Sequence, residues 1–253
     1  MRTTAGSYVG LDLNAAELAQ VARSISAPTE GRSPPAFIEA NAYRLPCRER
    51  AFSAVVVIRV FHHFGRPAEF LAELARCTVP GARLLLQYNP KPTVGTLVMD
   101  LRRGLRPSTP NRPGVTWSRS PMVRIPGERF PIYVLTASAV RAAVEGAGFR
   151  VLSERGTGVE RMQRWFPSMW QRTLPAQGPL AALLPSRFLL CERTSTPTSG
   201  TEVSSTWLAC PRCRTPMSPG PESSSWTERC PQCGFSIESD GSVIRARYTP
   251  SGE

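Results

Sequence analysis

A chain of 253 residues is long enough for one large core and a small additional module. Its composition, 41% hydrophobic and 8% aromatic, is typical of a folded globular protein and excludes a disordered or fibrous one. No apolar run approaches the ~18 residues of a membrane span. No apolar segment follows the first residues as it does in a secretory signal. We therefore expect a cytoplasmic protein that does not enter a membrane.

The net charge of +12 suggests an anionic partner such as a nucleic acid. Arginine supplies almost all of the positive charge, and Lys91 is the only lysine. No compact basic run with interleaved aromatic residues is present, so the charge alone does not decide between RNA binding and a compositional bias.

The N-terminal region predicts a strand followed by a helix. Residues 8–13 (YVGLDL) form a short apolar run that ends near Asp12, and residues 15–24 have a helical pattern with Asn14 as the N-cap. A carboxylate at such a junction holds ribose hydroxyls in nucleotide-binding α/β folds, although an ordinary turn residue is the simpler interpretation.

Residues 37–64 predict two buried strands at the centre of a sheet. Residues 37–40 are apolar and end at Asn41 and Ala42, and residues 53–60 (SAVVVIRV) are a continuous β-branched run. Such a run favours a strand covered by helices on both faces, and hence a parallel α/β sheet. Ligands bind at the carboxyl ends of strands in these sheets. Arg59 and the turn Phe61-His62-His63-Phe64 fall at such an end.

The remaining elements alternate in the same way up to a polar linker. Residues 93–129 are rich in proline and arginine, and we expect an ordered insertion or lid anchored by Trp117, Met122, Val123 and Ile125. We expect helices at 66–77 (ended by Pro80-Gly81), 97–105 and 136–146, strands at 82–88, 150–154 and 188–191, and a Ser/Thr linker at 194–206.

Four of the seven cysteines form two CxxC units separated by sixteen residues: Cys210, Cys213, Cys230 and Cys233. This spacing predicts a closed, tetrahedral zinc site with a structural role. Gly234 provides the tight turn after the second unit. The other three cysteines are isolated, which indicates reduced thiols and not a disulfide framework.

Residues 8–193 resemble a class I S-adenosylmethionine-dependent methyltransferase, most closely the ubiquinone-biosynthesis-like (type 11) branch. The segments that carry this resemblance are YVGLDLN, EANAYRLPCRERAFSAVVV, IRVFHHFGRPAEFLAELARCTVPGARLLL and RFPIYVLTASAVRAAVEGAGFRVL. The C-terminal segment resembles the zinc ribbon of small activator proteins that partner RNA and protein methyltransferases.

The resemblance implies a role for particular residues toward the cofactor S-adenosyl-L-methionine. Asp12 would accept hydrogen bonds from the ribose hydroxyls. Asn41, where the family usually has Asp, would face the adenine amine, and the backbone of Ala42 would lie near the adenine. Arg59 and Phe61 would line the methionine end. The family has no universal catalytic residue, because alignment and desolvation of the acceptor do most of the work.

His62 and His63 are candidates for a base that removes a proton from a substrate hydroxyl or amine. The simpler interpretation is that one histidine is packed and the other solvated.

The sequence departs from the family in one respect. The family has a first strand and a glycine-rich turn before the strand that residues from Tyr8 onward resemble. Only seven residues precede Tyr8. Because that strand is central in the family, its loss leaves hydrogen-bonding groups of both neighbours unpaired. Three explanations are open: a start further upstream, a strand supplied by a partner or second copy, or a closed-up sheet that no longer binds the cofactor.

We therefore expect a Rossmann-like methyltransferase domain, incomplete at its N-terminus, at residues 1–193, a linker at 194–206 and a zinc ribbon at 207–247. The expected function is methyl transfer to a small-molecule or RNA acceptor, with a possible protein partner at the ribbon. The alternative is a degenerate, non-catalytic domain that binds a partner or RNA.

Overall fold

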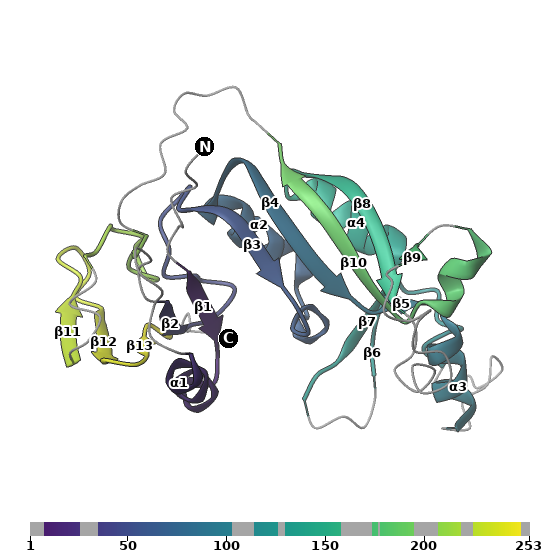
Figure 1. Cartoon of the computed structure of the whole chain (residues 1–253), viewed down its shortest axis with the longest axis horizontal. Helices are drawn as coiled ribbons and strands as arrows, with labels where there is room; N and C mark the ends of the chain where they lie inside the picture. The colour runs from purple at the N-terminus through teal and green to yellow at the C-terminus, as the bar shows by residue number, and fades with distance from the viewer. Residues whose placement is uncertain are drawn as a thin grey trace. The chain divides into compact units, whose positions relative to one another are not determined.

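The structure of the chain is a computed structural model that describes residues 8–25, 35–102, 114–125, 130–157, 174–176, 178–194, 207–218 and 225–248. Contacts within the chain divide it into two units (Figure 1). Unit 1 combines Met1–Ala51 with Glu202–Glu253, and unit 2 is Phe52–Thr201. Each unit has a sheet of its own.

Unit 1 contains one five-stranded sheet built from both ends of the chain. Its strands follow the order β1-β2-β13-β12-β11, in which β1, β2 and β13 are parallel and β12 is antiparallel to its neighbours. The elements of unit 1 are β1 (Val9–Asp12), α1 (Ala15–Ser24), β2 (Ala36–Glu39), β11 (Ser225–Arg229), β12 (Ser236–Asp240) and β13 (Ile244–Arg245).

Helix α1 has the bounds that its sequence predicts, because its start is fixed locally. The side-chain oxygen of Asn14 accepts hydrogen bonds from the backbone N–H groups of Ala16 (3.1 Å) and Glu17 (3.3 Å), as an N-cap does. Leu18 on the buried stripe of the helix packs against Phe37 and Val243. The helix is thus anchored to residues from both ends of the chain.

Unit 2 contains the larger sheet, with strand order β3-β4-β10-β8-β9, and a small sheet of order β5-β7-β6. β3 and β4 are parallel, while β10 runs antiparallel between β4 and β8. The elements of unit 2 are β3 (Phe52–Val57), the 3₁₀ turn η1 (Phe61–His63), α2 (Pro67–Cys77), β4 (Thr78–Tyr88), β5 (Pro90–Lys91), α3 (Val94–Arg102), β6 (Met122–Arg124), β7 (Tyr133–Thr136), α4 (Ala137–Gly146), β8 (Phe149–Thr157), β9 (Leu174–Pro175), η2 (Pro179–Leu183) and β10 (Ser186–Arg193).

Pro80-Gly81 lies inside β4 and does not form the loop expected from the sequence. Helix α2 ends at Cys77, and β4 begins at the next residue. The pairing with β3 shifts register between Phe52 and Ala54, and Gly81 has φ +79°, a left-handed conformation. The dipeptide therefore forms an irregularity within the strand, where glycine tolerates the backbone geometry.

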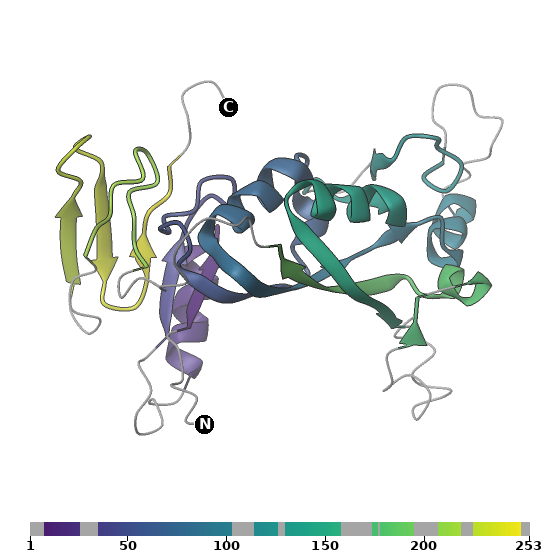
Figure 2. The ribbon, with the colours of Figure 1, turned by 90° about the horizontal axis from the view of Figure 1, so that it is seen from above.

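The described helices of unit 2 that cover the larger sheet, α2 and α4, lie on one face of it (Figures 1 and 2). On the opposite face Val56 is 63% exposed and Leu190 37% exposed. The prediction that residues 53–60 are covered on both faces is therefore wrong for the part of the chain that the structure describes. The continuous β-branched run forms β3, which is the terminal strand of its sheet, so such a run does not by itself show what covers a strand.

In the arrangement that the family resemblance implies, the family's first strand would lie between β1 and β3. In the structure β1 ends the sheet of unit 1, and β3 ends the larger sheet of unit 2. The two strands do not pair with each other within the described residues.

The segment after β4 is ordered around two buried charged residues. Lys91 is 3% exposed and donates from Nζ to the carbonyl oxygen of Ser118 at 3.1 Å. Asp100 is completely buried and accepts from the backbone N–H groups of Val115 (2.9 Å) and Thr116 (2.7 Å). These bonds fix residues 115–118 against α3 and β5.

The expected apolar anchors of this segment have different environments. Ile125 is buried with Val115 and Val134, and Val123 packs against them, whereas Trp117 is 42% exposed. The arginines Arg103, Arg106, Arg112 and Arg129 of the expected lid lie outside the described residues.

The division into units differs from the boundaries expected at residues 193 and 207. The ribbon shares a sheet with β1 and β2, and so belongs with the first part of the chain. None of the helices in the described ranges has the length and apolar character needed to cross a membrane.

Candidate functional site

Asp12 and Asn41 lie at the same edge of the unit 1 sheet. β1 and β2 are parallel, and Asp12 is in register with Glu39. The N–H of Ala40 donates to the carbonyl of Asp12 at 3.0 Å, which continues the pairing to the end of both strands. The carboxyl ends of β1 and β2 thus place at the same end of the sheet the two residues to which the resemblance gives the ribose and adenine roles.

The carboxylate of Asp12 is held in a defined orientation but stays accessible. Its Oδ1 accepts from the N–H of Asn14 at 2.9 Å, and the residue is half-buried. Among the described residues, Oδ2 has no hydrogen-bond partner. A half-buried carboxylate with one oxygen fixed by the backbone suits the recognition of a diol.

The amide of Asn41 is oriented by two backbone contacts. Its Oδ1 accepts from the N–H of Tyr43 at 3.0 Å, and its Nδ2 is 3.5 Å from the carbonyl of Tyr248. Since an amide oxygen has two lone pairs, Oδ1 can accept a second hydrogen bond from an amine. Asn41 and the adjoining Ala42 are both half-buried.

Arg59 lies at the corresponding carboxyl end of β3 in unit 2. Its backbone has φ +60°, and its N–H donates to Oε1 of Gln87 at 3.0 Å. The Gln87 amide in turn donates to the hydroxyl of Ser186 at 2.7 Å. This chain of bonds holds the left-handed turn at Arg59, and the side chain of Arg59 is exposed.

Phe61 is completely buried in an aromatic cluster. Its ring centroid lies 6.4 Å from that of Phe64 and 6.1 Å from that of Phe70, and the rings of Phe64 and Phe70 stack at 3.9 Å. This packing gives Phe61 a structural role, and its contact with a cofactor remains a prediction.

The two histidines of the chain are adjacent in η1 but have different environments. Their ring centroids are 4.1 Å apart. Burial lowers the pKa of His62 to about 4, with further contributions from His63 and Arg59, so His62 is neutral at pH 7. Nδ1 of the exposed His63 lies 2.9 Å from the carbonyl oxygen of Pro131. A carbonyl only accepts, so Nδ1 carries the proton of this bond, and Nε2 is the basic nitrogen of the neutral ring.

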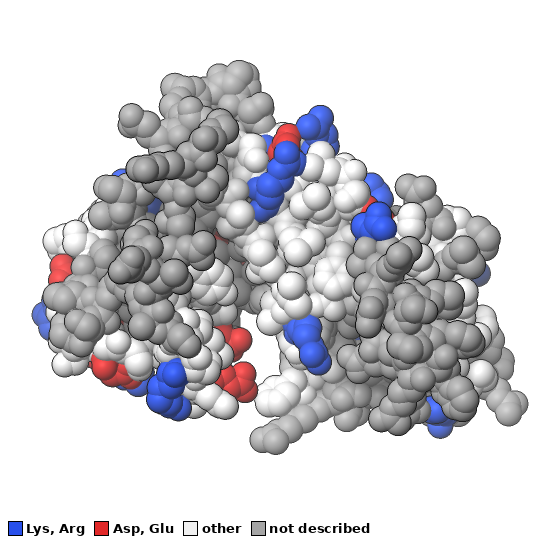
Figure 3. Space-filling view, viewed as in Figure 1, with Lys and Arg blue, Asp and Glu red and all other residues white. Residues whose placement is uncertain are grey.

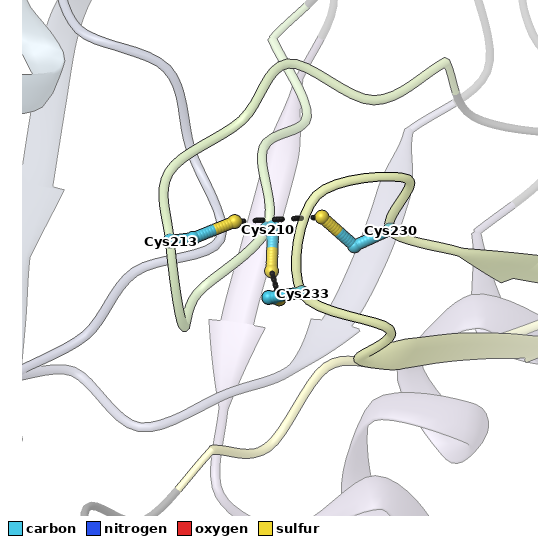
Figure 4. Close-up of side chains that lie close together, drawn as sticks. All are labelled: Cys210, Cys213, Cys230 and Cys233. Atoms are coloured by element: carbon cyan, nitrogen blue, oxygen red, sulfur yellow. Dashed lines mark hydrogen bonds between the residues drawn. The ribbon is translucent and has the colours of Figure 1, made fainter.

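The four cysteines of the two CxxC units converge on one point (Figure 4). All four sulfur atoms lie within 4.8 Å of one another. Sγ of Cys210 is 3.5 Å from that of Cys233, and Sγ of Cys213 is 3.4 Å from that of Cys230. Thiolates at about 2.3 Å from a central zinc ion are about 3.8 Å apart. The cluster therefore fits Zn²⁺ with little movement.

The two CxxC turns have the same backbone hydrogen bonds. Cys210 and Cys230 each accept from the N–H four residues later, at Arg214 (2.8 Å) and Gly234 (2.9 Å). Each also donates to the carbonyl five residues later, at Thr215 and Phe235. Arg214 and Gly234 both have left-handed backbones, with φ +65° and +73°. The two CxxC turns thus have the same knuckle conformation, and each directs its thiols toward the other.

The thiols differ in how easily they lose a proton. The 3.1 Å hydrogen bond between Sγ of Cys213 and the hydroxyl of Thr215 lowers the pKa of Cys213 to about 6. Burial raises the pKa of Cys210 to about 12. Zinc binds thiolates, so the metal has to displace the proton from Cys210, and its charge supplies the driving force.

Neither Gln87 nor the contact of Asn41 with Tyr248 is predicted by the sequence. Gln87 is a polar residue directly after the apolar run Leu84–Leu86 near the end of β4, a pattern that could have suggested a role at that end of the sheet. Asn41 and Tyr248 are 207 positions apart, and no local pattern could have predicted that contact.

The described basic side chains do not gather into one patch on the face in Figure 3. They form separate spots between uncharged surface, and several are paired with acids. Arg83 and Arg150 both contact Glu192, at 2.8 and 2.9 Å. This face therefore offers no continuous track for a phosphate backbone within the described residues.

A family model described as a methyltransferase domain matches residues 1–86. A solved S-adenosylmethionine-dependent methyltransferase from Methanosarcina mazei is similar in fold (TM-score 0.52, 16% identity, 75% of this chain and 83% of the other). A putative one from Listeria monocytogenes gives a TM-score of 0.51 at 11% identity, over 75% and 80%. No curated protein matches the chain. The similarity to these solved structures confirms the predicted Rossmann-like fold.

Proposed function

We propose that the chain is an S-adenosylmethionine-dependent methyltransferase that carries a structural zinc ion. The observation that supports this most is the placement of Asp12 and Asn41 at one edge of the β1–β2 pair, within the segment that matches the family. When bound, the cofactor supplies an electrophilic methyl group on a sulfonium.

The residues of the chain bind and orient the cofactor in this proposal. The carboxylate of Asp12 accepts from the ribose hydroxyls, and Oδ1 of Asn41 accepts from the adenine amine beside the backbone of Ala42. Arg59 and Phe61 act toward the methionine end, Arg59 through its exposed side chain. His63, with its Nδ1–H held by Pro131, keeps Nε2 available to accept a proton from the acceptor.

The four cysteines hold Zn²⁺ in this proposal, and the metal has a structural role. All four positions of a tetrahedral site are filled by sulfur, so no position is left for a water or a substrate. Quantifying zinc with a chelating dye in the purified chain tests this, with one equivalent expected.

Calorimetric titration with S-adenosylmethionine tests the cofactor site. Hydrogen bonds to a charged group contribute about 1.5–3 kcal/mol, so Asp12→Ala should weaken binding by about 10- to 150-fold. Asp12→Asn keeps an acceptor for Asn14 and should also weaken binding. Glu17→Ala removes a carboxylate from the first turn of α1 and is the matched control. Equal binding by all four proteins would exclude Asp12 from the site.

We propose an anionic acceptor, either a small molecule or RNA. The support is the exposure of the described arginines in residues 93–129, namely Arg102, Arg119 and Arg124. Incubation with methyl-labelled S-adenosylmethionine and separate RNA and small-molecule fractions distinguishes the two classes by which fraction gains label.

A further inference from the structure

The zinc ribbon is part of the sheet that carries Asp12 and Asn41. β13 pairs in parallel with β2, with Ile244 opposite Ile38 and Arg245 opposite Glu39. The N–H of Ala246 donates to the carbonyl of Glu39 at 3.0 Å. The strand that leads directly into Asn41 is therefore bonded to β1 on one side and to the ribbon on the other.

A second set of bonds joins the ribbon to the chain that follows Asn41. The N–H of Arg48 donates to the carbonyl of Trp207 at 2.8 Å, and the N–H of Ala209 donates to the carbonyl of Pro46 at 3.0 Å. Cys47 and Leu208 form an antiparallel bridge between these bonds. The loop that contains Asn41 is thus held by the ribbon at both of its ends, and the second attachment comes immediately before Cys210.

The metal cluster and β2 also share one apolar core. Ile38 and Ala40 are buried in a single cluster with Cys210 and Cys230, and Ile244 belongs to the same cluster. Two of the four predicted ligands therefore contact the core that fixes the end of β2. A change in the position of these cysteines therefore disturbs the apolar core to which Ile38 and Ala40 of β2 and its end belong.

We propose that metal loading of the four-cysteine cluster orders the cofactor-binding edge, so that the ribbon is a built-in sheet partner of Asp12 and Asn41. A ribbon of this size has too little core to fold without its metal. Without β13, β2 would keep only β1 and α1, and a two-stranded pair is marginally stable. The link to the cofactor rests on the function proposed above, whereas the link between metal and strand order does not.

Hydrogen exchange of the full chain, followed by mass spectrometry, tests the proposal directly. We compare zinc-loaded protein with protein treated with a chelator, and Cys210→Ala with Cys191→Ala. Cys191 is a buried cysteine in β10 of unit 2, outside the cluster. Exchange in residues 9–12 and 36–41 should rise at least about tenfold on metal removal and in Cys210→Ala, but not in Cys191→Ala. Unchanged exchange in these residues would overturn the proposal.

A junction variant separates the sheet contact from the metal. Ala246→Pro removes the N–H that bonds Glu39 and leaves all four cysteines in place. It should retain zinc and still show faster exchange in residues 36–39. Retained zinc with unchanged exchange would refute the role of β13.

Titration with S-adenosylmethionine, on the zinc-loaded and metal-free chains, distinguishes the two proposals. Weaker binding to the metal-free chain, together with faster exchange, supports both. If neither form binds while exchange still depends on zinc, the cofactor proposal fails and the dependence of strand order on the metal stands. Equal binding by both forms would overturn the coupling between metal and cofactor.

Discussion

Replacing Arg214 by glycine should stabilise the metal-loaded ribbon. Arg214 has φ +65° at the position where the second knuckle has Gly234 at +73°. A left-handed backbone costs a residue with a Cβ about 1–2 kcal/mol. The greater freedom of glycine in the unfolded chain offsets about 0.5–1 kcal/mol of that gain. At the midpoints of these ranges the net gain is about 0.75 kcal/mol, and it should make zinc binding about three- to fourfold tighter because metal binding and folding are linked.

Competition for zinc with a chromophoric chelator measures this change. Arg214→Ala is the matched control, because it removes the same side chain but keeps the Cβ. It should show none of the stabilisation, and any side-chain contact of Arg214 is lost equally in both variants. Gly234→Ala, in the equivalent knuckle position, should weaken zinc binding. If Arg214→Gly bound zinc no more tightly than Arg214→Ala, the backbone argument would be refuted.

Three further predictions concern unit 2. Asp100→Ala should destabilise unit 2 by about 3 kcal/mol or more, because it leaves Lys91 as a buried charge and two N–H groups without an acceptor. Urea unfolding measures this loss of stability. A loss below about 1 kcal/mol would contradict the buried network. His62 should titrate near pH 4 by NMR. The pKa of His62 in the folded protein lies below its unfolded value of 6.5. The contribution of His62 to stability is therefore complete above pH 6.5 and falls as the pH drops from 6.5 toward 4. Titration at the unfolded value would show that the ring is solvated. Tyr88→Phe should cost about 1–2 kcal/mol through loss of the 2.5 Å bond to Glu154, seen as a lower urea midpoint, and an unchanged midpoint would argue against that bond.

Local signals in the sequence predicted the elements that depend on near neighbours. Helix α1 has its predicted bounds because Asn14 caps it from one residue away, and α4 starts after Thr136 for the same reason. The four cysteines converge as predicted because each CxxC turn positions its own pair of thiols.

Relations between distant parts of the chain could not be predicted in the same way. The sequence placed the ribbon in a domain of its own, since residues 194–206 have the composition of a linker. Yet β13 pairs with β2 across about two hundred residues. A two-residue strand such as Ile244–Arg245 is too short to show a periodicity, so only the structure shows which strand it pairs with. The burial of Phe61 likewise has no local signal, because it depends on packing against Phe70 in the next helix.

The burial of Lys91 determines how the protein reacts with amine reagents. It is the only lysine in the chain, it is 3% exposed, and burial lowers the pKa of its amine. Amine-directed dyes and cross-linkers should therefore modify folded protein at the α-amino group alone. A single fluorophore or surface attachment can be placed at one end of the chain without mutagenesis. Labelling at Lys91 would then report the opening of the segment around Ser118.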